Sequence, residues 1–172
     1  MENEVENAIK SRRSIRKYSD TPIDKSLIIK MIETVCQAPS GKNLQPWKFV
    51  VVNNEKIRRE ISELSKYKKW MVTAPCYILV YMDNSLSYER IKDIQAIGAC
   101  VQNILLMAHS LNLGSCWVGE IVRQDNTIKD ILQISDNNLE LMALLTIGYA
   151  MEDTQEKGWR RSINDSILMC LN

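Results

Sequence analysis

Hydrophobic positions along the chain follow two patterns, one typical of amphipathic helices and one typical of buried strands. Apolar residues at helical spacing predict helices at about residues 2–11, from Asp24 up to the turn at Ala38, behind Asn54, at about residues 88–111 and at about residues 127–133. Continuous apolar runs of strand length predict buried strands at residues 48–52, 76–82 and 139–149. The chain is therefore predicted to mix helices and strands.

From Gln95 onward, the longest predicted helix is apolar around nearly its whole circumference. Only a narrow polar stripe interrupts this surface, and it is made by Gln95, Gln102, Asn103, His109 and Ser110. A helix of this kind is buried on several sides. One domain of 172 residues has difficulty surrounding it, so a partner subunit is one hypothesis and a central core helix in a monomer is the other. Gly114 is predicted to cap its C-terminus.

Composition indicates one ordinary globular domain over residues 1–172, with 45% hydrophobic and 25% charged residues. The net charge of +1 provides no overall basic field for nucleic acid. The cysteines are five in number and lack a C-x-x-C pair, so no metal site is predicted. The chain has neither a secretory signal near Met1 nor an apolar run of membrane-spanning length, so we expect a cytoplasmic protein with no membrane partner.

Residues 12–16, Arg12-Arg13-Ser14-Ile15-Arg16, concentrate three guanidinium groups and a hydroxyl. Guanidinium groups bind phosphate oxygens bidentately and stay charged, so this segment suits a phosphate monoester. In an extended segment Arg12, Ser14 and Arg16 would point the same way. The alternative is a solvated basic turn. Because the net charge of the chain is small, the cluster is predicted to be a local device for a small anion.

Three further segments are candidates for ligand binding. Residues 38–47 combine turn formers with the carboxamides of Asn43 and Gln45, which match the mixed donor and acceptor edge of a flavin. Residues 111–119 end in Gly119, which permits close backbone approach to a flat ligand. Cys116 in this segment has no neighbouring base, so a packed structural thiol is favoured over a nucleophile. The basic pair Arg160-Arg161 is either a solvated tail or part of a phosphate clamp.

Taken together, these segments resemble the FMN-dependent nitroreductase family. The resemblance spans nearly the whole chain in the family's order and rests on Arg12-Arg13-Ser14-Ile15-Arg16, Ala38-Pro39-Ser40, Asn43-x-Gln45-Pro46-Trp47, Gln102-Asn103, Leu113-Gly114-Ser115-Cys116-Trp117-Val118-Gly119, Gly148-Tyr149 and the closing basic pair. It implies an α+β fold with a central, mostly antiparallel sheet flanked by helices. It also implies an intertwined homodimer with FMN at the interface.

The resemblance also assigns roles to individual residues. It places Arg12 and Ser14 at the phosphate and ribityl end of FMN, and Arg16 at the N1–O2 edge of the ring. It brings one group of contacts from the other subunit and closes the phosphate end with one residue of the C-terminal basic pair. The predicted cofactor-binding residues are Arg12, Arg13, Ser14, Arg16, Pro39, Ser40, Asn43, Trp117, Val118, Gly119, Arg160 and Arg161, of which Pro39, Ser40 and Asn43 belong to the other subunit.

The implied function is reduction of small planar acceptors, such as nitroaromatics or quinones, with NAD(P)H as co-substrate. Hydride transfer through flavin N5 would be ping-pong, with no catalytic side chain and no metal, because the flavin carries the chemistry. The alternatives are other flavin chemistry, oxidative or dehalogenating, and a non-enzymatic dimer that binds a nucleotide or an anion. Residues 66–71 do not align confidently with the family, and Lys68 and Lys69 are predicted to face water.

Overall fold

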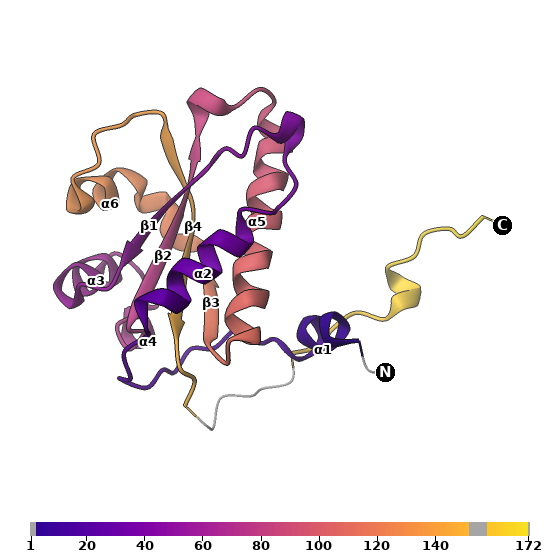
Figure 1. Ribbon diagram of the computed structural model, residues 1–172, viewed down its shortest axis with the longest axis horizontal. Helices are drawn as coiled ribbons and strands as arrows, with labels where there is room; N and C mark the ends of the chain where they lie inside the picture. The colour runs from indigo at the N-terminus through magenta and orange to yellow at the C-terminus, as the bar shows by residue number, and fades with distance from the viewer. Residues whose placement is uncertain (1–2, 152–157, 172) are drawn as a thin grey trace.

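The computed structural model describes residues 3–151 and 158–171, and these form a four-stranded sheet with helices on both faces (Figure 1). The strands run in the order β1-β2-β4-β3, with the bounds Trp47–Val52 for β1, Cys76–Asp83 for β2, Gly114–Val118 for β3 and Leu139–Gly148 for β4. Each neighbouring pair is antiparallel. The predicted α+β fold with a mostly antiparallel sheet is therefore confirmed.

The helices agree with the predicted segments, with one addition. In the described residues they are α1 (Glu4–Ser11), α2 (Lys25–Val35), α3 (Glu55–Glu63), α4 (Lys68–Met71), α5 (Arg90–Ser110) and α6 (Asp125–Leu132). Short 3₁₀ turns occur at η1 (Gly41–Asn43), η2 (Asn84–Leu86), η3 (Glu120–Gln124) and η4 (Ile163–Asp165). The short helix α4 was not predicted, and residue 2, where the first helix was predicted to begin, lies outside the described residues.

Two predicted helix starts are explained by capping. The Asp24 carboxylate accepts the backbone N–H of Ser26 at 2.7 Å, and the Asn54 side chain accepts that of Ile57 at 3.1 Å. Each bond satisfies an N–H that has no partner within the first turn.

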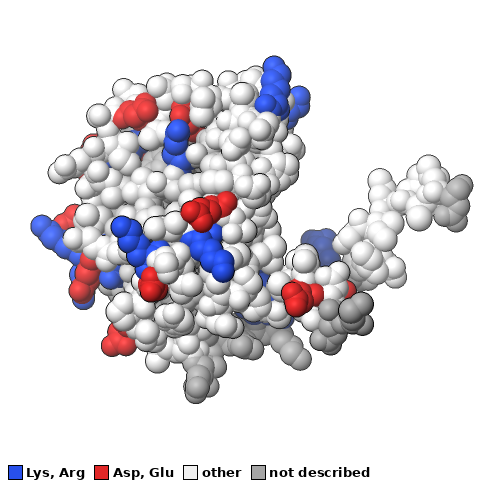
Figure 2. Space-filling model, in the orientation of Figure 1, with Lys and Arg blue, Asp and Glu red and all other residues white. Residues whose placement is uncertain are grey.

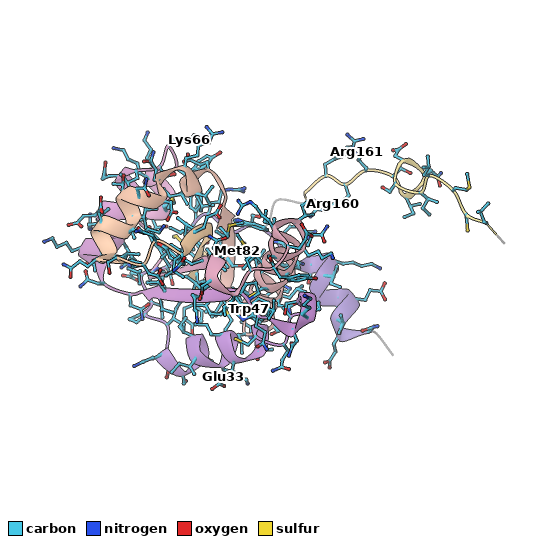
Figure 3. All side chains as sticks on the ribbon, turned by 90° about the horizontal axis from the view of Figure 1, so that it is seen from above. Glu33, Trp47, Lys66, Met82, Arg160 and Arg161 are labelled. Carbon is cyan, nitrogen blue, oxygen red and sulfur yellow. The ribbon has the colours of Figure 1, made fainter. Side chains whose placement is uncertain are left out.

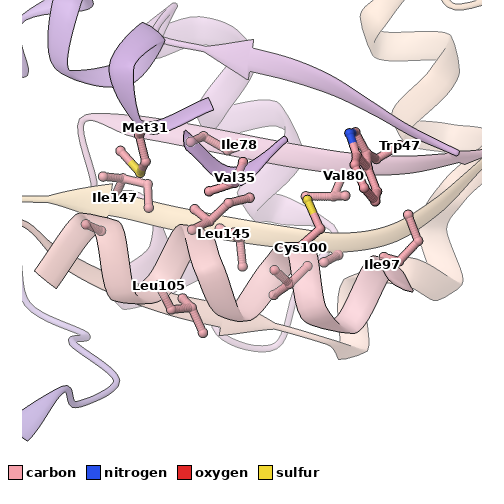
Figure 4. Packing of buried hydrophobic residues seen from close by; sticks show 14 of the residues in the cluster. Met31, Val35, Trp47, Ile78, Val80, Ile97, Cys100, Leu105, Leu145 and Ile147 are labelled. Carbon is pink, nitrogen blue, oxygen red and sulfur yellow. The ribbon is translucent and has the colours of Figure 1, made fainter. Parts of the chain in front are cut away.

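The sheet is covered on both faces. On one face α2 and α5 pack through a buried cluster that includes Met31, Val35, Ile97, Cys100 and Leu145 (Figure 4). On the other face α3, α4 and α6 contribute to a second cluster through Ile61, Met71 and Ile128. Every residue of β2 is buried. This two-sided burial explains why β2 is a continuous apolar run in the sequence instead of an alternating one.

The C-terminus of α5 corrects one prediction. Asn112, not Gly114, takes the left-handed conformation, with φ of 59°, and the N–H of Leu113 donates to the carbonyl of Ala108 at 2.8 Å. This is the Schellman pattern with asparagine in the usual glycine position. Gly114 instead begins β3, where an added Cβ would lie 2.9 Å from three side-chain atoms of Ile15. The glycine is needed there because Ile15 packs directly on the strand.

Helix α5 is only partly covered by its own chain. One side is buried against the sheet and α2, whereas Ile91 and Ile94 on the helix are 67% and 39% exposed. A Cβ added at Gly98 would meet nothing within 4 Å. The apolar residues from Ala96 to Leu111 are buried or half-buried within the described chain, and the exposed apolar side chains of α5 lie near its start.

The surface carries no large field of one sign. On the face shown in Figure 2, lysine and arginine are interspersed with aspartate and glutamate. None of the helices in the described residues is long and apolar enough to cross a lipid bilayer. Residues 158–171 extend away from the rest of the molecule (Figure 1). They carry exposed apolar side chains, among them Leu168, which is 99% exposed.

Candidate functional site

Residues 12–16 lie alongside β3, at the edge of the sheet. Ser14 forms a parallel bridge with Ser115, and the N–H of Ile15 donates to the Ser115 carbonyl at 2.9 Å. Ile15 is buried, whereas Ser14 and Arg16 on either side of it are exposed. Tyr18 anchors the segment further on, because its buried hydroxyl bonds the Ile15 carbonyl at 2.6 Å. The extended backbone of this segment therefore separates the buried isoleucine from its polar neighbours, as the alternation of side chains requires.

The arginines of this segment differ in how far they are engaged. Arg13 donates through Nη1 to the backbone carbonyls of Lys10 at 2.7 Å and Arg12 at 2.9 Å. Within the described residues, the guanidinium groups of Arg12 and Arg16 form no ion pair or hydrogen bond. These two side chains remain free to bind an anion.

The surroundings of Arg12 favour a negative partner. Burial lowers the pKa of Arg12 from its ordinary value, and the charges of Arg160 and Arg13 lower it further. Three guanidinium groups thus lie near one another, and among the described residues no carboxylate pairs with Arg12 to balance their charge. An anion bound between them would relieve this repulsion and replace the lost hydration of Arg12.

Two cavities open along the segment. The first, which we name the Arg12 cavity, has a volume of about 200 Å³ and is lined by Arg12, Arg13, His109, Ser115 and others. The second, the Gly119 cleft, has a volume of about 430 Å³ and is lined by Arg16, Tyr67, Trp70, Cys116, Trp117, Val118, Gly119 and Glu120. One free arginine lines each cavity, so the segment joins a cationic pocket to a cleft rich in aromatic side chains.

Both cavities have features that fit a flat ligand with an anionic end. Ser115 is among the residues that line the Arg12 cavity, and its buried hydroxyl has no hydrogen-bond partner in the described residues. At Gly119 an added Cβ would have only the Trp117 indole nitrogen nearby, at 4.0 Å, so the backbone there is open to a ligand. Trp117 is 44% exposed beside it, and Val118 is buried.

Cys116 and His109 have structural surroundings. Burial raises the pKa of the Cys116 thiol, which disfavours the nucleophilic thiolate. His109 Nε2 lies 2.7 Å from the Ser11 hydroxyl, so the histidine joins the end of α5 to the end of α1. Its pKa is lowered by burial and by the charges of Arg12 and Arg13, so the neutral ring is favoured.

A second group of predicted residues lies at the opposite end of α5. Ser40 precedes η1 and Asn43 is its last residue, and the Lys42 ammonium of this turn lies 4.5 Å from the centroid of the Tyr88 ring, just before α5 begins. Pro39 is exposed beside them. With 21 residues α5 is about 30 Å long. The described chain therefore does not bring Pro39, Ser40 and Asn43 together with the arginines of residues 12–16.

The C-terminal arginines also differ from each other. The charge of Arg160 contributes to the lowered pKa of Arg12, so the two guanidinium groups lie near each other. Arg161 lies further along the outgoing chain, as Figure 3 shows. This geometry favours Arg160 as the nearer candidate for a ligand that Arg12 binds.

Sequence reasoning missed the aromatic side of the Gly119 cleft. Tyr67 and Trp70 line it from the turn before α4 and from α4 itself. Two aromatic residues within four positions were the available signal, but they fall in the stretch that did not align with the family. Lys68 pairs with Glu63 at 2.8 Å and does not line this cleft, and Lys69 is exposed.

The fold and the site define an α+β protein with a cationic, glycine-lined site at the edge of an antiparallel sheet. The family model of nitroreductases matches residues 9–68 and 62–149. A Methanothermobacter thermautotrophicus protein named as an NADH dehydrogenase/NAD(P)H nitroreductase is 36% identical over 154 residues, which cover 87% of this chain and 79% of that protein. A similarly named Archaeoglobus fulgidus protein is 33% identical over 84% of each chain.

A solved structure also indicates the nitroreductase family. A protein assigned as a nitroreductase from Desulfovibrio desulfuricans, in complex with FMN, is 35% identical and has a TM-score of 0.92 over 100% of this chain and 99% of its own. The chain belongs to the nitroreductase family, and it is an oxidoreductase of that family.

Proposed function

We propose that the protein binds FMN along residues 12–16 and the adjoining end of β3, and that it uses NAD(P)H to reduce small planar acceptors. The observation that carries this proposal is the pair of unengaged guanidinium groups of Arg12 and Arg16, one at each cavity along the same segment. FMN has a phosphate at one end and a flat ring at the other, so it matches both cavities. The orphaned Ser115 hydroxyl and the open backbone at Gly119 also fit this cofactor.

In this proposal the chain holds FMN by charge at one end and by shape at the other. Arg12, with Ser14 and Arg160, would bind the phosphate and the ribityl chain, while Arg13 supports the segment through its bonds to backbone carbonyls. Trp117, Val118 and Gly119 would lie along the ring. Arg161 remains a secondary candidate for the phosphate.

The chemistry would need little from the side chains. When bound, FMN supplies the hydride transfer itself. Arg16 would place a fixed positive charge beside the ring, and such a charge favours an anionic ring over a neutral one. The Gly119 cleft would admit NAD(P)H and the acceptor in turn, which is the ping-pong order.

A homodimer would complete this site. Within one chain, Pro39, Ser40 and Asn43 lie at the end of α5 remote from Arg12. A second copy with its α5 antiparallel to the first would bring its η1 turn to this arginine. The exposed apolar residues of α5 and of residues 158–171 provide surface for such an intertwined contact.

The direct test is FMN binding to the Arg12→Ala variant, measured by flavin fluorescence. Loss of a charge-assisted bond of about 1.5–3 kcal/mol weakens binding by roughly 10- to 150-fold. Riboflavin, which lacks the phosphate, should bind wild type and variant equally. Arg59→Ala, which removes an exposed arginine paired with Glu55 at 2.7 Å, is the matched control. Equal FMN affinity of Arg12→Ala and wild type would place the phosphate elsewhere.

The acceptor class is tested separately by steady-state rates with NADH and NADPH against nitroaromatics, quinones and non-planar acceptors. Parallel double-reciprocal lines at several fixed acceptor concentrations are expected for the ping-pong order. Intersecting lines would mean that both substrates bind together, and no turnover with any planar acceptor would contradict the proposed reaction.

A further inference from the structure

The η1 turn and the residues that follow it hold an unfavourable backbone conformation. Left-handed φ values of 52°, 56° and 51° occur at Lys42, Asn43 and Gln45. None of these residues is glycine, and a residue with a Cβ adopts this conformation at a cost in free energy. Three such residues within four positions persist only where the surrounding structure holds them. The same turn carries Asn43 and follows Ser40, which are predicted to contact FMN in the other subunit.

The Tyr88 side chain holds this turn. An added Cβ at Gly41 would lie 2.5 Å from Tyr88 Cε1 and 2.6 Å from the Tyr88 hydroxyl, so the ring lies directly on the backbone of η1. The Lys42 ammonium lies 4.5 Å from the centroid of the same ring, and the Lys92 ammonium lies 5.4 Å from it. Because a cation is attracted to the face of an aromatic ring, Lys42 and Tyr88 restrain each other.

A buried carboxylate fixes the position of Tyr88. Asp93 on α5 is fully buried, and its Oδ2 accepts the N–H of Tyr88 at 3.2 Å. The same oxygen accepts from the Ser87 hydroxyl at 2.6 Å and from the Glu89 N–H at 3.1 Å. The other oxygen, Oδ1, is buried without a hydrogen-bond partner among the described residues. A buried carboxylate with one oxygen unpaired is costly, and what it provides here is a fixed loop at residues 87–89.

The start of α5 has its own cap, so Asp93 is not needed for capping. The Glu89 carboxylate accepts the N–H of Ile91 at 3.0 Å and that of Lys92 at 3.2 Å. The Asp93 carboxylate instead binds groups that precede the first helical residue, Arg90. Its bonds therefore determine where the loop before the helix lies, and with it the ring that lies on η1.

We infer that Tyr88 is a positioning residue that holds the η1 turn in the conformation needed at the cofactor site of the other subunit. The inference rests on the proposed function for the FMN site and the dimer, and it adds the residue that shapes the contribution of the second copy. Ser40 and Asn43 would touch FMN, whereas Tyr88 acts through the turn. A change of Tyr88 in one copy should then affect the site that contains Arg12 of the other copy.

The first test needs no cofactor. In FMN-free protein, hydrogen exchange of the Asn43 and Leu44 amides, which bond backbone carbonyls at 3.0 and 3.1 Å, should accelerate roughly tenfold in Tyr88→Ala. Tyr88→Phe keeps the ring on the turn and should exchange at the wild-type rate. Leu86→Ala is the matched control, because Leu86 is as exposed as Tyr88, at 38%, and lies outside the loop that Asp93 binds. Unchanged exchange in Tyr88→Ala would overturn the inference.

The second test measures FMN affinity. Tyr88→Ala should bind FMN roughly fivefold to thirtyfold more weakly than wild type, which corresponds to re-ordering about one backbone residue on binding. Tyr88→Phe should restore the affinity of wild type. Tyr88→Ala should remain a dimer in sedimentation experiments, since the residue acts on the turn and not on assembly. Wild-type affinity of Tyr88→Ala, or its dissociation into monomers, would contradict the inference.

A mixed dimer separates action on the other subunit's site from action within one subunit. Arg12→Ala and Tyr88→Ala chains with different affinity tags are co-expressed, and dimers that carry both tags are isolated. If Tyr88 acts across the interface, one site combines both defects and the other has neither, so we expect one site of wild-type affinity per dimer. The absence of such a site would mean that Tyr88 acts within its own subunit, against the inference. Failure of wild type to bind FMN would contradict the proposed function alone, because the hydrogen-exchange result does not depend on FMN.

Discussion

At the scale of single residues, identical amino acids at this site have different contacts and therefore different predicted roles. Arg13 is held by backbone carbonyls while Arg12 and Arg16 are unengaged. The motif identified the segment, but which guanidinium group remains available depends on where α1 ends. Two glycines differ in the same way, since Gly114 admits the Ile15 side chain and Gly119 is open to a ligand.

The two glycines allow a matched comparison. Gly114→Ala should lower the free energy of unfolding by about 1–3 kcal/mol, because the added carbon overlaps Ile15. Gly119→Ala should leave stability unchanged within ~0.5 kcal/mol and should weaken FMN binding, because its Cβ enters the cleft instead of the core. Urea unfolding of the FMN-free variants and FMN titration measure the two effects. Unchanged FMN affinity of Gly119→Ala would show that the ring does not approach this residue.

His109 should make the free energy of unfolding depend on pH in a predictable direction. Burial and the charges of Arg12 and Arg13 lower its pKa below the ordinary 6.5. The unfolded chain then takes up a proton first, so the free energy of unfolding should decrease as the pH falls below about 6.5 and through the folded pKa. His109→Gln removes this contribution and should give a shallower loss of stability in urea unfolding of FMN-free protein between about pH 7.5 and pH 5.5. Equal slopes for the two proteins would contradict the assignment.

At the scale of elements, local signals were the most informative. The caps at Asp24 and Asn54 were predictable because each acts within three residues of the helix start. β3 was missed because its five residues follow α5 after a short turn, and its pairing partner β4 begins more than twenty residues later in the sequence. α4 was missed because one helical turn leaves no measurable periodicity.

The end of α5 provides a test at this scale. Asn112→Ala should lower the free energy of unfolding by about 1 kcal/mol, because alanine tolerates the left-handed conformation poorly. Asn112→Gly should keep the stability of wild type or exceed it, because glycine is the usual residue in this motif. Thermal or urea unfolding measures both variants. Equal destabilisation by alanine and glycine would mean that the asparagine side chain, not its backbone conformation, is what stabilises the helix end.

At the scale of the whole molecule, the sequence pattern left open whether a partner subunit or its own chain covers α5. The described chain buries or half-buries the apolar residues from Ala96 to Leu111 and leaves Ile91 and Ile94 near the start of the helix exposed. Sequence motifs also named two groups of predicted cofactor-binding residues, although their separation along α5 became visible only from the fold. The position of Tyr67 and Trp70 at the Gly119 cleft was not predicted, because it depends on a turn that Glu120 holds from a distant part of the chain.

The dimer proposal is tested by charging one side of α5. Ile94→Lys should shift the protein toward a monomer in sedimentation experiments, because a lysine would be buried between the two copies. FMN affinity should fall in parallel, since each site needs residues of both copies. Ile29→Lys on α2, where the isoleucine is 46% exposed, should leave the dimer intact. A stable dimer of Ile94→Lys with normal FMN affinity would place the interface on another surface.

The central claim is that this chain holds FMN in a position where NAD(P)H reduces it. The most direct measurement mixes FMN-loaded protein with NADH or NADPH without oxygen and follows the visible absorbance of the oxidised flavin. We expect the absorbance to disappear with one of the two nucleotides and to return when a quinone is added. A protein that binds FMN yet keeps it oxidised with both nucleotides would contradict the claim.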